Sequence, residues 1–111
     1  MKVVVIGLNF EIKMKAGFFK TQAYCLTTGS GQIILTPLGN SEMERQVIEW
    51  EELKSVSIIS RSMTSVELEI TTHSRTYFGS ISSSADLEEI IRNLAREFSN
   101  KFIFQHGDIQ T

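Results

Sequence analysis

Three lysines in the first 20 residues have the type and spacing that best suit ligand binding. Lys13 and Lys15 are two residues apart, so their side chains share a face if this segment is a strand, and Lys20 follows them. Three ammonium groups could hold one phosphate or a few anionic lipid headgroups, at about 1 kcal/mol per charge near an anionic surface. The alternative is a solvated sheet edge whose lysines discourage pairing with another sheet.

The only thiol, Cys25, is a candidate nucleophile. A cysteine nucleophile needs a base beside it, and no motif places either histidine, His73 or His106, next to Cys25. Zinc ligands usually come in closely spaced pairs such as C-x-x-C, which this sequence lacks. We therefore interpret Cys25 as a small residue that fills a strand, and we predict no catalytic residue and no metal site.

Glu67 and Glu69 form a carboxylate pair, which can perform acid–base chemistry when one member is desolvated. They alternate with Val66, Leu68 and Ile70. This period of two places both carboxylates on the wet face of a half-buried strand. The pattern therefore favours a solvated surface, and we expect neither enzymatic activity nor a cofactor.

The composition is that of an ordinary globular domain. The chain has 111 residues, of which 41% are hydrophobic and 22% charged, and its net charge is −2. This length predicts one domain, and the composition excludes a disordered chain, a coiled coil and a disulfide scaffold. Because the net charge is slightly negative, there is no overall attraction to nucleic acid, and we expect no nucleic-acid partner.

No targeting segment is recognisable in the sequence. The longest early apolar run, residues 3–8, is shorter than the core of a secretory signal, and no stretch reaches the roughly 18 residues of a transmembrane helix. A single cysteine cannot form a disulfide within the chain. We therefore expect a cytoplasmic protein.

Most of the chain up to residue 81 has the alternation that is typical of half-buried strands. The loop Gly29-Ser30-Gly31 predicts a tight hairpin, and His73-Ser74 predicts another turn. About seven strands are expected, in part of residues 2–15 and in residues 21–28, 32–38, 45–51, 54–59, 65–71 and 75–81.

One amphipathic helix is predicted near residues 83–100. Apolar side chains recur there every three or four residues, and Ser83 with Asp86 forms a start that is similar to a capping box. Acidic residues lie in the first turn and basic residues near the end, which suits the helix dipole. The side chains expected to be buried against the sheet are Leu87, Ile91, Leu94 and Phe98.

This order of elements predicts a mainly β fold with a single C-terminal helix. Tight turns between the strands predict antiparallel pairing throughout. One helix cannot cover seven flat strands, so we expect the sheet to bend over on itself and the helix to plug its open side. The domain is expected to span residues 1–103, followed by a flexible tail over residues 104–111.

Three segments carry a family resemblance. Residues 31–36 are glycine, glutamine, two isoleucines, leucine and threonine. Residues 48–56 have the pattern of an apolar strand, a tight turn and then Ser-Val. Residues 75–79 have the pattern of a last strand, which continues through residues 83–86 into the helix. Over roughly residues 15–102 this order resembles bacterial pleckstrin-homology-like (PH-like) and GRAM-type domains. The resemblance implies a PH-like barrel of seven antiparallel strands capped by one helix.

The resemblance also bears on ligand binding. PH domains that bind phosphoinositides usually carry several Lys and Arg residues around their first hairpin, whereas the loop Gly29-Ser30-Gly31 has none. The basic residues that remain upstream of it are Lys13, Lys15 and Lys20.

We therefore expect a non-catalytic PH-like interaction module that acts through protein contacts or self-association. Phe18 and Phe19 cannot both face inward on one strand, and the apolar residues 102–104 continue beyond the helix, so both places offer contact surface. The alternative is an adaptor for phospholipids or phosphoinositides, with weak attraction to anionic lipid through the three lysines. A small enzyme would need a deep polar pocket, which a plugged barrel lacks.

Overall fold

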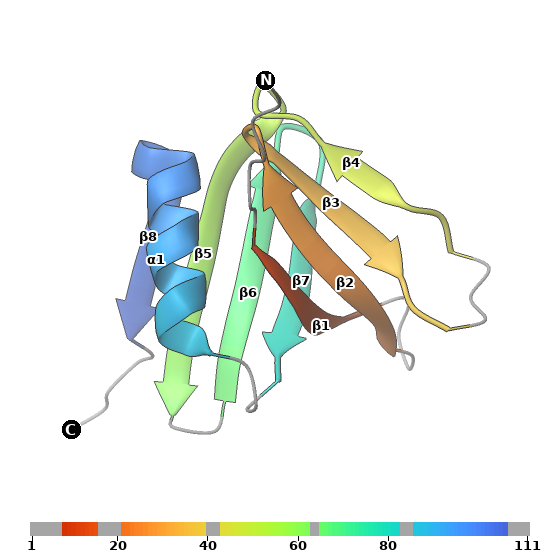
Figure 1. Cartoon of the computed structure of the whole chain (residues 1–111), viewed down its shortest axis with the longest axis horizontal. Coiled ribbons are helices and arrows are strands. Elements are labelled where there is room, and N and C mark those ends of the chain that lie inside the picture. The colour runs from red at the N-terminus through yellow and green to blue at the C-terminus, as the bar shows by residue number, and fades with distance from the viewer. Residues whose placement is uncertain (1–7, 16–20, 40–42, 63–64, 83–85, 107–111) are drawn as a thin grey trace, which may run out of the picture.

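In the part of the chain that the structure describes, one mixed sheet of eight strands carries a single α-helix on one face (Figure 1). The computed structural model describes residues 8–15, 21–39, 43–62, 65–82 and 86–106, and the following statements concern these residues. In chain order the elements are β1 (Asn9–Lys15), β2 (Thr21–Gly29), β3 (Gln32–Pro37), β4 (Gln46–Ile48), β5 (Leu53–Ser62), β6 (Ser65–Thr72), β7 (Thr76–Ile81), α1 (Leu87–Phe98), a 3-10 turn (Ser99–Lys101) and β8 (Phe102–His106). Across the sheet the order is β4-β3-β2-β1-β7-β6-β5-β8.

Two antiparallel meanders, β1–β4 and β5–β7, meet at a short junction between β1 and β7. Three residue pairs join them: Ile12 with Ile81, Lys13 with Ser80, and Met14 with Gly79. In Figure 1 strands β2 and β3 run obliquely across the direction of β5 and β6, so the sheet changes direction at this junction. The sheet is not closed, because β4 and β8 remain its two edges.

Gly79 permits the close contact between β1 and β7. A Cβ atom at this position would lie 2.9 Å from Ile12 Cδ1 and 3.2 Å from Met14 Cγ. Ile12 and Met14 are themselves buried in the core, so the space that a side chain at residue 79 would need is already filled. The glycine therefore fixes how closely the two meanders can pack.

Alternation along each strand separates a buried inner face from an exposed outer face. In β1 the side chains of Phe10, Ile12 and Met14 are buried, whereas Lys13 and Lys15 are exposed. Helix α1 lies on the inner face, over strands β5 and β8 (Figure 1). The core also contains Leu26, Ile33, Leu35, Val56, Ile58, Leu68, Ile70, Ile90, Leu94 and Phe98.

The helix begins at Leu87 and ends at Phe98, inside the range predicted for it. Asp86 caps its N-terminus, because the Asp86 carboxylate accepts a hydrogen bond of 3.2 Å from the backbone N–H of Glu89. The predicted cap residue Ser83 lies outside the described residues.

Burial of the helix follows the predicted stripe with one adjustment. Leu94 and Phe98 are fully buried, as predicted, and Ile90 is buried with them. Leu87 and Ile91 are only partly buried, although both pack against the core. The centre of the buried stripe therefore lies slightly to the Ile90 side of the predicted one.

The C-terminal end of α1 contacts two turns of the sheet, the β4–β5 turn and the β2–β3 turn. The rings of Trp50 and Phe98 stack with 6.3 Å between their centroids and 9° between their planes. The Nζ atom of Lys101 lies 4.0 Å from the centroid of the Trp50 ring and donates to the Trp50 carbonyl oxygen. The carboxylate of Glu97 accepts from the backbone N–H of Gly31. Trp50 lies in the β4–β5 turn rather than in the strand predicted over residues 45–51.

The predicted hairpin turns are confirmed. Gly29 pairs with Gln32, and the two residues between them, Ser30 and Gly31, have φ angles of 55° and 78°. Positive φ at both positions is the mark of a type I′ turn, which matches the twist of the strands that it joins. His73 lies in the turn between β6 and β7, also as predicted.

The C-terminal strand corrects two predictions. Residues 104–111 were predicted to form a tail, but Phe104, Gln105 and His106 belong to β8, while residues 107–111 lie outside the described residues. Strand β8 pairs with β5 in parallel, from Val56 with Phe102 to Ser60 with His106, so the prediction of purely antiparallel pairing is wrong. The physical reason is the connection: a tight turn reverses the chain, whereas β8 follows a helix, which lets two strands of a sheet point the same way.

Candidate functional site

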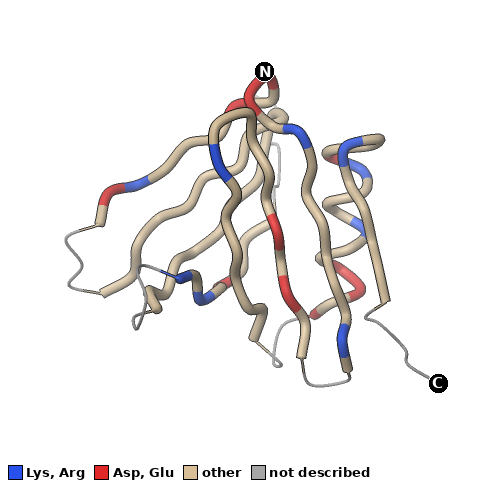
Figure 2. Tube along the Cα trace, turned by 180° about the vertical axis from the view of Figure 1, so that it is seen from behind, with Lys and Arg blue, Asp and Glu red and all other residues tan. Residues whose placement is uncertain are grey.

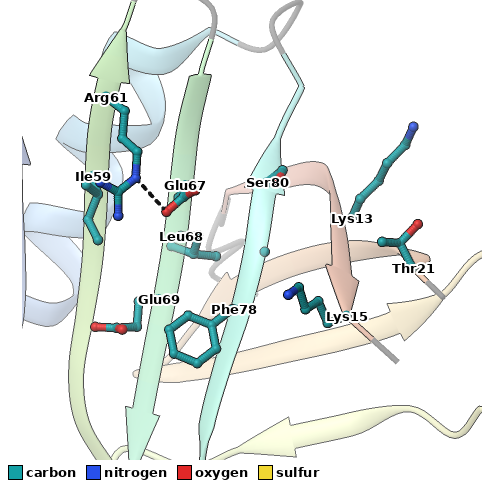
Figure 3. A pocket seen from close by; sticks show the side chains of 11 residues that line it. Lys13, Lys15, Thr21, Ile59, Arg61, Glu67, Leu68, Glu69, Phe78 and Ser80 are labelled. Carbon is teal, nitrogen blue, oxygen red and sulfur yellow. Dashed lines mark hydrogen bonds and ion pairs between the residues drawn. The ribbon is translucent and has the colours of Figure 1, made fainter. Parts of the chain in front are cut away.

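A groove opens on the outer face of the sheet at the β1–β7 junction and encloses about 480 Å³ (Figure 3). Lys13 and Lys15 of β1 line one wall, and Glu67 and Glu69 of β6 line the opposite wall. Phe78 of β7 lies between these walls. The remaining lining residues are Thr21, Ile59, Arg61, Leu68, Gly79 and Ser80.

The register of the sheet explains why these side chains meet. Lys13 pairs with Ser80, which in turn pairs with Glu67, so these three residues form one row across the outer face. Phe78 pairs with Glu69 in the next row. Lys15 comes one residue after the last β1–β7 pair and is level with Phe78, at the point where β1 and β7 separate. The groove is therefore a product of this separation.

Phe78 is the most exposed of the large hydrophobic side chains in the described part of the chain, at 54% relative exposure. Its neighbour Tyr77 points to the inner face and packs against the core. An aromatic ring exposed between a basic and an acidic wall offers apolar contact area and a π face to a ligand.

The charges of the groove are only partly paired. Arg61 Nε lies 3.0 Å from Glu67 Oε1, with both side chains about half exposed, so this pair contributes little to stability. Within the described ranges, Lys13, Lys15 and Glu69 form no salt bridge. In the view from behind (Figure 2), β6 carries the acidic positions of the groove and no basic one. Strand β1 carries Lys13 and Lys15 together with Glu11 on the same outer face, but Glu11 does not line the groove. The groove thus has a cationic side and an anionic side.

The structure places two of the three predicted site lysines together. Lys13 and Lys15 share the outer face of β1, as their spacing predicts, whereas Lys20 lies outside the described residues. Glu67 and Glu69 were interpreted only as solvated residues, and their place opposite the lysines was missed. No local signal reveals it, because strands β1 and β6 are brought together through the β1–β7 pairing of residues far apart in the sequence.

The two edges of the sheet form a second candidate surface, and they differ in character. Strand β4 has three residues and is flanked by the exposed charged residues Glu44, Arg45 and Glu49. Strand β8 has five residues without any Lys, Arg, Asp or Glu, and its Ile103 and Phe104 are 41% and 38% exposed. Natural proteins usually protect an edge by shortness or charge, and β8 has neither feature.

The residues considered for catalysis are dispersed. Cys25 lies in β2, where its thiol donates to Asn9 Oδ1, and His73 lies in the β6–β7 turn. His106 lies at the end of β8, edge-on to the Phe104 ring with 5.0 Å between centroids. Over the described ranges, no three His, Cys, Asp or Glu residues are grouped so that they could hold a metal ion. The predicted apolar contact at Phe18 and Phe19 falls on residues outside those described.

Within the described part of the chain, no helix combines the length and the apolar character needed to cross a bilayer. Neither a scan against protein-family models nor a search of curated proteins finds a match for this chain.

Proposed function

We propose that this chain is a non-catalytic interaction module of PH-like architecture that associates with a second copy of itself through strand β8. Two consecutive antiparallel meanders followed by a helix on the inner face support the architecture. A lone cysteine suits the cytoplasmic location that forms part of the proposal.

The unprotected edge of β8 carries the proposal. A strand at the edge of a sheet presents unpaired N–H and C=O groups, which can bond to a strand of another chain. On β8 this edge coincides with exposed apolar side chains on both faces, Ile103 on the outer face and Phe104 on the inner face. Pairing would satisfy the backbone groups and remove both side chains from water.

A second copy fits this edge because β8 is complementary to itself. If two β8 strands pair antiparallel around Phe104, each Phe102 faces His106 of the other copy, and each Ile103 faces Gln105. The two Phe104 rings meet at the centre, where aromatic cross-strand pairs are favourable. Because β8 carries no full charge, no like charges oppose each other, and the contact has the two-fold symmetry of common homodimers.

Sedimentation velocity at micromolar concentration tests the proposal. We expect a mass of about twice the 12.6 kDa of the chain. Ile103→Lys would place like charges near the two-fold axis. This variant should be a monomer that is still folded, as its melting temperature would show. The matched control is Val47→Lys, because Val47 is 38% exposed on the β4 edge; this variant should still form the dimer.

Two results would contradict self-association through β8: a wild-type monomer over the whole concentration range, or equal dissociation of the dimer by both variants. The alternative function is a lipid adaptor, which is supported by the position of Lys13 and Lys15 on one exposed face. Binding to anionic vesicles that is lost in the double variant Lys13→Glu, Lys15→Glu would support that alternative.

A further inference from the structure

We propose that the groove at the β1–β7 junction binds a zwitterionic group in which a phosphate is joined by a two-carbon linker to an ammonium, as in phosphocholine and phosphoethanolamine. This site is separate from the β8 edge, and none of its lining residues belongs to β8. It therefore adds a small-ligand site to the interaction function proposed above.

Opposite charges lie on the two sides of Phe78. Lys15 on β1, Phe78 on β7 and Glu69 on β6 are level on three adjacent strands. The backbones of the outer two are more than two strand spacings apart, that is more than about 10 Å, because the pairing of β1 with β7 ends at Met14. Flexible lysine and glutamate side chains can reach inward from this distance, so a ligand with an anion at one end and a cation at the other can touch both. In Figure 3 the Lys15 ammonium group points toward the Phe78 ring.

The cationic end of the ligand would meet two partners in the groove, the Phe78 ring and the Glu69 carboxylate. An ammonium or trimethylammonium group is attracted both by the π face of an aromatic ring and by a carboxylate. Phe78 presents such a ring at 54% exposure, and Glu69 is its direct pairing partner on β6. The Glu69 carboxylate forms no salt bridge with another described residue, so it is available to a ligand.

A purely anionic ligand fits the charges of the groove less well. The one guanidinium in the groove, that of Arg61, is already neutralised by Glu67 at 3.0 Å. A phosphate held by Lys15 would also experience the negative charge of Glu69 across the groove, and in Figure 3 the Lys13 ammonium group points away from Phe78. An ammonium on the same ligand removes this repulsion. The volume of about 480 Å³ lies within the usual range of small-ligand sites, about 300–1,000 Å³.

Amide NMR titration with soluble phosphocholine tests the site directly. We expect saturable shifts at Lys15, Phe78 and Gly79 but not at the core residue Leu94, with a Kd on the order of 1 mM for so open a site. Inorganic phosphate alone and choline alone should each bind more weakly, because each satisfies only one wall. Co-sedimentation with pure phosphatidylcholine vesicles is a separate experiment. If the protein co-sediments, the site is assigned to membrane headgroups. If soluble phosphocholine causes shifts but the vesicles do not bind, the site is assigned to the free compound.

Single substitutions separate the two walls. Lys15→Gln and Glu69→Gln should each weaken phosphocholine binding by about two- to fivefold, the effect of one exposed ion pair. Lys54→Gln is the matched control, because Lys54 is an exposed lysine that does not line the groove. Equal affinity for phosphate and phosphocholine, unchanged affinity in Glu69→Gln, or no shifts with any of the three probes would overturn the proposal. None of these results depends on whether the chain forms a dimer.

Discussion

The Trp50 and Phe98 rings stack almost in parallel, with 6.3 Å between their centroids, and so join the β4–β5 turn to the end of α1. Phe98 is completely buried, whereas Trp50 is partly exposed and lies under the Lys101 ammonium group. The contact packs the C-terminal end of α1 against the β4–β5 turn.

Phe98→Ala should lower the free energy of unfolding by about 3–5 kcal/mol, because it removes a fully buried ring and leaves a cavity beneath Trp50. Urea denaturation followed by Trp50 fluorescence would measure this change, since Trp50 is the only tryptophan. Arg92→Ala on the exposed side of α1 is the control, with an expected change below about 0.5 kcal/mol. A loss of less than 1 kcal/mol in Phe98→Ala would contradict the described helix packing.

Gly79→Ala should destabilise the fold by about 1–3 kcal/mol, because its Cβ atom would lie 2.9 Å from Ile12 Cδ1. The double variant Gly79→Ala, Ile12→Val removes that Cδ1 atom, so it should lose less stability than the sum of the two single changes. Gly29→Ala is the control, because a Cβ atom there meets nothing within 4 Å. Simple additivity in thermal unfolding would show that the β1–β7 junction is not limited by this contact.

Gly31→Ala should cost about 1–2 kcal/mol, because residue 31 has a φ angle of 78°, which side chains other than asparagine and aspartate rarely adopt. Gly31→Asn should therefore cost less than Gly31→Ala. Chemical denaturation of the two variants gives the comparison. If alanine were tolerated better than asparagine, the contact with Trp50, whose Cβ lies 3.4 Å from a Cβ at residue 31, would outweigh the preference of asparagine for positive φ, and the prediction would be wrong.

Local patterns account for the elements that could be predicted from the sequence. Alternation places Lys13 and Lys15 on the exposed face of β1, and the Ser30-Gly31 pair forms the expected turn. The apolar repeat of α1 correctly marks Leu94 and Phe98 as core residues. Each of these features depends on residues that are close together in the chain, where side-chain direction follows directly from backbone geometry.

The features that matter most for binding arise from pairing between distant segments. Nothing near Glu69 in the sequence indicates that it lies across Phe78 from Lys15; the three β1–β7 residue pairs decide this. Nothing near Phe104 indicates a parallel strand, because its pairing partner, Ile58 of β5, lies far away in the chain. Alternation along the chain therefore determines which side chains face outward. Non-local backbone pairing and core packing determine which strands are neighbours and in which register they pair. This pairing brings the two walls of the groove together.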